Sequence, residues 1–146
     1  DGDGRSCLQL ETNVDDATPE VLAHSIAAIL RAGAHDAWIT PIVMKKGRPA
    51  HTVHALCDDA ALGAVRDAIV AETGTFGLRA FRVERWPQRR RDAAVEVDGQ
   101  TIRVKVGGHR SQAEFDDAAA AALALGRPLR EVVDEAERAA ADLRLD

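Results

Sequence analysis

The chain has 146 residues, 46% of them hydrophobic and 29% charged, and a formal net charge of −5. This length and apolar content predict one compact domain, with or without an appendage, and exclude global disorder. Because no apolar run reaches the roughly 18–20 residues of a membrane span and the net charge is acidic, we expect neither a membrane nor a nucleic acid as a partner.

The first six residues, 1–6, are polar and glycine-rich, which indicates a linker or the edge of a domain cut from a longer protein. A predicted strand follows at 8–14. Thr18 and Pro19 are typical of a helix start, and Gly33 is typical of a helix end. The apolar side chains between them recur at helical spacing: Leu22, Ile26, Ile29 and Leu30.

Residues 37–44 form a nearly continuous apolar run, which predicts a strand buried on both faces, although Pro41 indicates an edge or a bulge. The next predicted elements are, in chain order, a turn at 45–49, a strand at 51–57, a helix after 58–59 and a strand at 78–83. The order β-α-β-β-α-β predicts a ferredoxin-like domain over 7–85, with an antiparallel sheet and both helices on one face.

A smaller second unit is predicted over 86–146. Alternating valines and isoleucines surround 98–99, an Asp-Gly pair that favours a two-residue hairpin. Ser111 and Glu114 predict a capping box before an alanine-rich helix, and Pro128 opens a last helix. The fold class is therefore α+β: a ferredoxin-like domain followed by a β-hairpin and two C-terminal helices.

The first candidate site is the ETNVDD segment, 11–16, where the first strand runs into the first helix. Three carboxylates and an amide oxygen within six residues could bind a hard divalent cation. Glu11, Asn13 and Asp15 share one face if the strand continues. The alternative is that the acidic residues only favour the positive end of the helix that follows.

The second candidate is the KKGRP turn, 45–49. Lysines act as point charges and arginine as a planar fork, so three cations in a tight turn could hold a polyphosphate. The chain has 16 arginines and only three lysines, so an adjacent pair, Lys45 and Lys46, indicates that lysine is required here. A solvated positive turn is the alternative.

The third candidate is ETGTFGLR, 72–79, whose hydroxyls, amides and glycines suit phosphate or sugar oxygens. It lacks the spacing of a Walker loop, and a plain helix-to-strand turn is the alternative. His51 and His54 are three residues apart on a strand and point to opposite faces, which is poor metal-ligand spacing. Cys7 and Cys57 are expected to be buried free thiols, which suits a reducing cytoplasm.

Four blocks together resemble the C-terminal domain of the LarC family: ETNVDDATPE (11–20), PIVMKKGRP (41–49), ETGTFGLR (72–79) and, more loosely, AEFDD (113–117). LarC proteins are nickel-insertion proteins that mature the nickel-pincer nucleotide cofactor of lactate racemase. The order and spacing of the blocks agree with that family over nearly the whole chain.

The resemblance implies an enzyme, a CTP-dependent cyclometallase of the chelatase and lyase kind. Such an enzyme inserts nickel, its substrate metal, into pyridinium-3,5-bisthiocarboxylic acid mononucleotide with the help of Mn²⁺ or Mg²⁺. It further implies an N-terminal nickel-binding domain that these 146 residues do not include, a homo-oligomer (trimer or higher) and a cytoplasmic location. A non-catalytic nucleotide-sensing or oligomerisation module of ferredoxin-like fold is the alternative.

By this resemblance the nucleotide site would consist of Asn13, Lys45, Lys46, Arg48 and Thr75, and the metal would be held by Asp15 and Asp16. The end of the first strand and the 45–49 turn are expected at opposite ends of a fully extended sheet. Such a separation would require a site shared between subunits or a more irregular fold.

Overall fold

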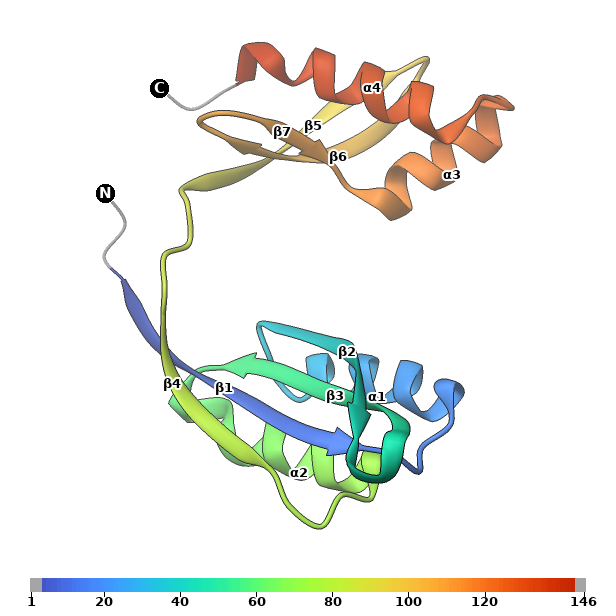
Figure 1. Cartoon of the computed structure of the whole chain (residues 1–146). Helices are drawn as coiled ribbons and strands as arrows, with labels where there is room; N and C mark the ends of the chain where they lie inside the picture. Colours follow the sequence, from blue (N-terminus) through green and yellow to red (C-terminus); the bar gives the residue numbers. More distant parts are fainter. Residues whose placement is uncertain (1–3, 144–146) are drawn as a thin grey trace. The chain divides into compact units, whose positions relative to one another are not determined.

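The computed structural model describes residues 4–143. They divide between Trp86 and Pro87 into two compact units, each of which is described by itself (Figure 1). This division lies one residue after the boundary indicated by the sequence, between 85 and 86. The linker expected at 1–6 is wrong for Arg5 and Ser6, which already belong to the first strand, and 1–3 lie outside the described residues.

The first unit is a four-stranded antiparallel sheet with strand order β2-β3-β1-β4 and two helices packed on one face, which confirms the ferredoxin-like prediction (Figure 1). Its elements are β1 (Arg5–Val14), α1 (Pro19–Arg31), β2 (Asp36–Met44), η1 (Lys45–Gly47), β3 (Arg48–Cys57), η2 (Asp59–Ala61), α2 (Leu62–Thr73) and β4 (Arg79–Arg85).

Alternation along β1 gives the sheet two different faces. Leu8, Leu10 and Val14 are buried in the core with apolar residues of α1 and α2. Glu11 and Asn13, the intervening residues, lie on the other face, which we call the open face because neither helix of this unit covers it. The open face is therefore available for polar chemistry, while the opposite face holds the unit together.

Helix α1 begins as expected, since the Thr18 hydroxyl accepts a hydrogen bond from the Val21 N–H at 3.3 Å and Pro19 occupies the first turn. Helix α2 ends at Gly74, whose φ of +68° is a left-handed conformation that glycine adopts without steric cost. The start of α1 thus follows the end of β1, and the end of α2 leads into β4, which pairs with β1.

Strand β2 corrects the expectation of a strand buried on both faces. It pairs only with β3 and forms an edge of the sheet, and the Val43 side chain is 75% exposed. Pro41, opposite His51 in the register, is tolerated because an edge strand has one side that needs no backbone donor.

The second unit is a three-stranded antiparallel sheet, with order β5-β6-β7, covered by two helices that share a separate core with it. Its elements are β5 (Arg90–Val97), β6 (Gln100–Gly107), β7 (Ser111–Ala113), α3 (Phe115–Leu125), α4 (Leu129–Ala139) and η3 (Ala141–Leu143). The predicted hairpin is confirmed, with Asp98 and Gly99 both at positive φ.

The predicted capping box is wrong. Ser111 belongs to β7 and is buried, and its hydroxyl donates to the Ala140 carbonyl at 3.2 Å. Glu114 is itself the N-cap residue of α3 and makes no side-chain capping bond. None of the helices within 4–143 is long and apolar enough to cross a membrane.

Candidate functional site

The strand register brings the end of β1 and the turn between β2 and β3 to the same end of the sheet. Strands β1 and β2 are both antiparallel to β3, so they run in the same direction and finish together. The Arg48 Nη1 atom lies 3.4 Å from the Asp15 Oδ2 atom. The expectation of opposite ends is therefore wrong, and one subunit brings these residues together.

The loop between α2 and β4 lies beside the same end of β1, because Arg79 at the start of β4 pairs with Glu11. The hydroxyl oxygens of Thr75 and Thr12 are 2.6 Å apart, and both lie within hydrogen-bond distance of the Gly77 carbonyl, at 2.8 and 2.9 Å. We call these three neighbouring segments the sheet-end site: the acidic bend 15–16, the basic turn 45–48 and the threonine loop 74–77.

The basic turn is largely uncompensated. Lys45 and Lys46 are exposed, and no carboxylate among the described residues pairs with either of them. Arg48 has one ion pair, the 3.4 Å contact with Asp15, and its side chain is 60% exposed. Lys46 has a φ of +63°, a left-handed conformation that is unfavourable for a residue with a Cβ. Three cations are thus presented to solvent on a tight turn.

The acidic bend offers oxygen ligands but no complete metal site. Asp15 is partly buried, with a side chain 29% exposed, and Asp16 is exposed. Within 4–143, no group of three or more His, Cys, Asp or Glu side chains lies close enough to hold a metal ion. A divalent cation held here would therefore need most of its ligands from phosphate oxygens and water, which is common for Mg²⁺.

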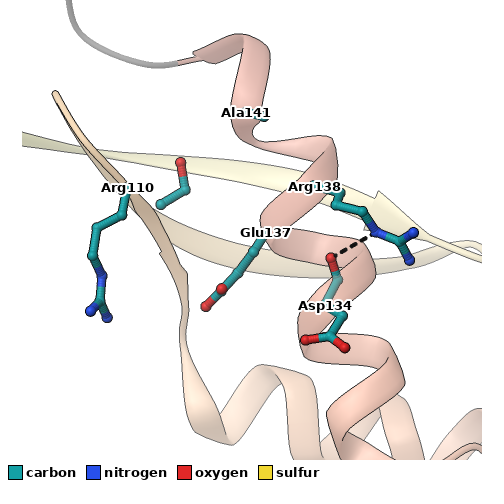
Figure 2. Close-up of a pocket in the computed structure, with 6 residues that line it drawn as sticks. Arg110, Asp134, Glu137, Arg138 and Ala141 are labelled. Carbon is teal, nitrogen blue, oxygen red and sulfur yellow. Dashed lines mark hydrogen bonds between the residues drawn. The ribbon is translucent and has the colours of Figure 1, made fainter.

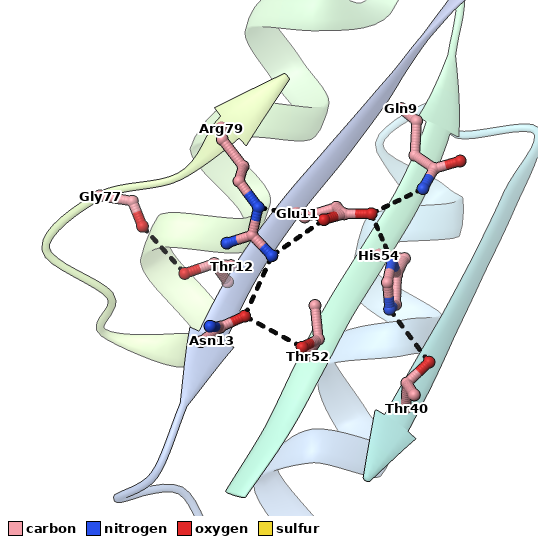
Figure 3. Close-up of polar contacts among 9 residues, drawn as sticks. All are labelled: Gln9, Glu11, Thr12, Asn13, Thr40, Thr52, His54, Gly77 and Arg79. Carbon is pink, nitrogen blue, oxygen red and sulfur yellow. Dashed lines mark hydrogen bonds and ion pairs between the residues drawn. The ribbon is translucent and has the colours of Figure 1, made fainter. Parts of the chain in front are cut away.

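A polar network lies on the open face beside the sheet-end site (Figure 3). Glu11 accepts a hydrogen bond from Gln9 at 2.7 Å, contacts His54 Nδ1 at 3.0 Å and pairs with Arg79 Nη2 at 2.9 Å. Burial raises the pKa of Glu11, but the hydrogen bond from Gln9 and the charges of His54 and Arg79 outweigh it, so the pKa lies below its usual range. Glu11 is thus held as a carboxylate.

Asn13 connects this network to the sheet-end site. Its Oδ1 atom accepts hydrogen bonds from Thr52 at 2.9 Å and from Arg79 at 3.2 Å (Figure 3). These bonds fix the side chain by its oxygen and leave its NH₂ group as the donor for a ligand. Among the predicted nucleotide contacts, Asn13 is the residue whose side-chain amide is oriented by hydrogen bonds from Thr52 and Arg79 of this network.

His54 is a residue that the sequence reasoning missed. Its Nε2 atom lies 3.0 Å from the Thr40 hydroxyl, and its ring stacks on Trp38 with centroids 4.9 Å apart. The sequence correctly set it on the face opposite to His51, but only the register places it across from Glu11. The sequence showed only that Thr52 and His54 share one face of their strand, and this alternation does not reveal that Glu11 lies opposite His54.

The other histidines and both cysteines show no sign of a metal site. His24 faces Glu72 at 3.6 Å and His35 faces Asp58 at 3.0 Å, each at a surface contact. Cys7 and Cys57 are buried and free, which confirms the expectation for both.

The fourth block of the family resemblance lies in the second unit. Asp117 accepts hydrogen bonds from the Arg103 guanidinium at 2.7 and 2.8 Å, which lower the pKa of Asp117 to about 2. Glu114 pairs with Lys105. These carboxylates connect the start of α3 to β6 and therefore have a structural role.

A hollow of about 510 Å³ also lies in the second unit, and nothing in the sequence indicated it. It is lined by Arg110, Ser111, Asp134, Glu137, Arg138 and Ala141 (Figure 2). Glu137 accepts a hydrogen bond from the Ala113 N–H, and Arg138 donates to the Asp134 carbonyl. The hollow is thus lined by two arginines and two carboxylates, whose formal charges balance.

A family model described as "Nickel insertion protein" matches residues 2–133. The "Pyridinium-3,5-bisthiocarboxylic acid mononucleotide nickel insertion protein" of Nocardioides sp. is 49% identical over 138 residues, covering 91% of this chain and 35% of that protein. A "Putative nickel insertion protein" of Myxococcus xanthus is 40% identical over 129 residues, covering 85% of this chain and 33% of that protein. The chain thus spans about a third of the length of these relatives.

Among solved structures, the chain resembles "LarC2, the C-terminal domain of a cyclometallase involved in the synthesis of the NPN cofactor of lactate racemase, apo form". The TM-score is 0.85 at 31% identity, covering 94% of this chain and 98% of that one. A protein from Methanopyrus kandleri matches with a TM-score of 0.56 at 26% identity, covering 92% of this chain and 88% of that one. The chain therefore belongs to the nickel insertion protein family and corresponds to its LarC C-terminal domain.

Proposed function

We propose that this chain is the CTP-binding domain of an enzyme that inserts nickel into pyridinium-3,5-bisthiocarboxylic acid mononucleotide, and that CTP binds at the sheet-end site with Mn²⁺ or Mg²⁺. The observation that carries the proposal is the meeting of an acidic bend, a basic turn and a threonine loop at one end of a single sheet. The relatives support the substrate, because one of them is named as a nickel insertion protein for that mononucleotide.

The charges of the sheet-end site suit a metal–triphosphate complex. Lys45, Lys46 and Arg48 would neutralise phosphate oxygens, and two of these three cations have no competing carboxylate within the described part of the chain. Asn13, with its oxygen already engaged by Thr52 and Arg79, would donate its NH₂ group. The Thr75 hydroxyl, whose hydrogen is already engaged with Thr12 or the Gly77 carbonyl, would contact the nucleotide as a hydrogen-bond acceptor.

The acidic bend suits the accompanying cation. Asp15 and Asp16 supply carboxylate oxygens, the donor type that Mg²⁺ and Mn²⁺ prefer. The bound cation would neutralise part of the phosphate charge. Arg48, 3.4 Å from Asp15, joins the acidic and basic parts and would keep the Asp15 carboxylate turned toward the turn.

Nickel insertion itself is proposed for the full-length protein rather than for this domain alone. The solved relative is named as the C-terminal domain of a cyclometallase, and the chain spans about a third of its curated relatives. We infer that an N-terminal nickel-binding domain acts together with it, with Ni²⁺ as the substrate metal. Two buried free thiols are consistent with a reducing cytoplasmic location.

The open face of the first sheet is the surface that we propose for self-association, as a trimer or larger oligomer. Phe81 of β4, on this face, is 48% exposed, and Trp38 lies on the same face at the opposite edge of the sheet, in β2, where its ring stacks on His54 of the Glu11 network. Aromatic groups around a polar centre are typical of protein interfaces. Sedimentation of the Phe81→Glu variant tests this, since an unchanged mass would contradict it.

Titration calorimetry with Mg²⁺–CTP tests the central proposal. The double variant Lys45→Ala, Lys46→Ala should lose measurable binding and keep the circular dichroism spectrum of the parent chain, because both side chains are exposed. The matched control is Arg66→Ala, which removes an exposed cation of α2 paired with Asp67 and should bind as the parent does. An unchanged affinity of the double variant would refute the phosphate assignment.

A further inference from the structure

Phe76 is the most exposed large hydrophobic side chain recorded within 4–143, at 109% of its reference area. A ligand that covered this fully exposed ring would gain the free energy of burying its apolar surface. Phe76 stands between Thr75 and Gly77 in the threonine loop of the sheet-end site, and not on a face of a helix or sheet. Its position makes a ligand of that site the natural partner.

The loop presents this ring from a fixed base. Thr12 and Thr75 share the Gly77 carbonyl through contacts of 2.9 and 2.8 Å, and the Thr12 hydroxyl itself is buried at the end of β1. On the N-terminal side, Gly74 closes α2 at φ +68°. The residues on both sides of the loop tip are thus tied to the sheet and helix, while the ring between them is free.

The space around the ring is open. A Cβ atom added at Gly74 or at Gly77 would meet no atom within 4 Å. The backbone on both sides of the loop tip is therefore uncrowded, and the full exposure of Phe76 leaves its ring face accessible to a planar group.

The register sets the distance over which one ligand must reach. The threonine loop contacts residue 12 of β1, and the basic turn contacts residue 15 through Arg48. Three residues of extended chain span at most about 10 Å. The threonine loop and the basic turn therefore meet the β1 segment within about 10 Å of each other along the chain, a separation that a nucleoside triphosphate could bridge with its phosphates at the turn and its base at the loop.

We propose that Phe76 stacks on the nucleobase of the nucleotide whose phosphates bind the basic turn. This inference rests on the proposed function and adds to it the residue that holds the base. Stacking on an aromatic ring is tolerant of base identity, because every base has a flat π face. Phe76 would therefore supply affinity for a nucleoside, and the choice among bases would come from polar groups such as the Asn13 amide.

The test compares Mg²⁺–CTP with Mg²⁺–tripolyphosphate, which has the phosphates and lacks the base. Phe76→Ala should weaken CTP binding about ten-fold, within the range of base–aromatic stacking, and leave tripolyphosphate binding unchanged. The double variant Lys45→Ala, Lys46→Ala should bind both CTP and tripolyphosphate more weakly. Phe76→Trp should retain CTP binding, and Phe115→Ala, which removes another exposed ring from α3, should bind both ligands as the parent does.

Three results would overturn the inference. One is unchanged CTP affinity of Phe76→Ala, and another is an equal loss for CTP and tripolyphosphate, which would indicate a disturbed loop. The third is a smaller sedimenting mass of Phe76→Ala, which would place the ring in a subunit interface. If the parent chain binds neither ligand, the proposed function itself fails, and that outcome is distinct from the other three.

Discussion

Opposing effects act on the pKa of the Glu11 carboxyl group. Burial raises its pKa, and the hydrogen bond from Gln9 together with the charges of His54 and Arg79 lowers it by more. A carboxyl group with a lowered pKa in the folded chain stabilises the fold above the ordinary glutamate pKa of about 4.3. That stabilisation is lost as the pH falls through the lowered pKa.

Replacing Glu11→Gln should therefore flatten the dependence of unfolding free energy on pH between about pH 5 and pH 3. Urea unfolding of the parent and the variant at a series of pH values measures this difference. If both chains show the same slope across that range, the carboxylate is not stabilised by its three partners.

Lys46 combines exposure with an unfavourable backbone conformation, φ +63°. The left-handed region costs a residue with a Cβ roughly 1–2 kcal/mol, whereas glycine adopts it freely but loses more chain entropy on folding. Lys46→Gly should therefore stabilise the fold by about 0.5 kcal/mol and at the same time weaken Mg²⁺–CTP binding. Denaturant midpoints and calorimetry on the same samples measure both effects. A variant that loses stability would show that the lysine conformation carries no strain.

At the scale of elements, α2 has one glycine inside it and a second glycine as its C-cap, and the two differ in conformation. Gly63 lies within the helix, where an added Cβ would meet nothing within 4 Å, while Gly74 ends the helix at φ +68°. Gly63→Ala should stabilise the chain by about 0.5 kcal/mol through a lower entropy of the unfolded state. Gly74→Ala should destabilise it by roughly 1–2 kcal/mol. Thermal and denaturant unfolding measure both, and equal effects of the two changes would contradict the assigned cap.

The order and type of elements in the first unit could be predicted from the sequence, because helix caps and period-two strands are local signals. For strand β2 the apolar run wrongly predicted burial on both faces, since such a run looks the same at an edge as in the centre of a sheet, whereas Pro41 correctly indicated an edge. The same limit applies to β7. Ser111 satisfies the capping pattern locally, yet its hydroxyl bonds to the Ala140 carbonyl, a contact separated by 29 residues that no local pattern contains.

The candidate site shows the same division between local and long-range information. The acidic bend, the basic turn and the threonine loop were each visible as motifs, and the scarcity of lysine singled out Lys45 and Lys46. Their meeting at one sheet end follows from strand direction, which becomes certain only with the pairing of β1, β2, β3 and β4. His54 was missed for this reason, because its partner Glu11 is 43 residues away.

At the scale of the whole molecule, the two units have two cores with no residue in common. The first contains apolar residues of β1, β3, α1 and α2, and the second contains residues of β5, β6, α3 and α4. The sheet-end site belongs entirely to the first unit. Its binding properties should therefore depend on the first core and be insensitive to moderate damage in the second.

Two matched core substitutions test this independence. Val53 is fully buried in the first core and Val104 in the second, at 0% and 1% exposure. Each change to alanine should cost about 2 kcal/mol through lost burial and the cavity left behind. Hydrogen exchange followed by mass spectrometry should show Val104→Ala lowering protection only in the second unit, with Mg²⁺–CTP affinity retained, and Val53→Ala lowering protection in the first unit. If Val104→Ala lowers protection equally in both units, the molecule unfolds as one cooperative body and the site depends on both cores.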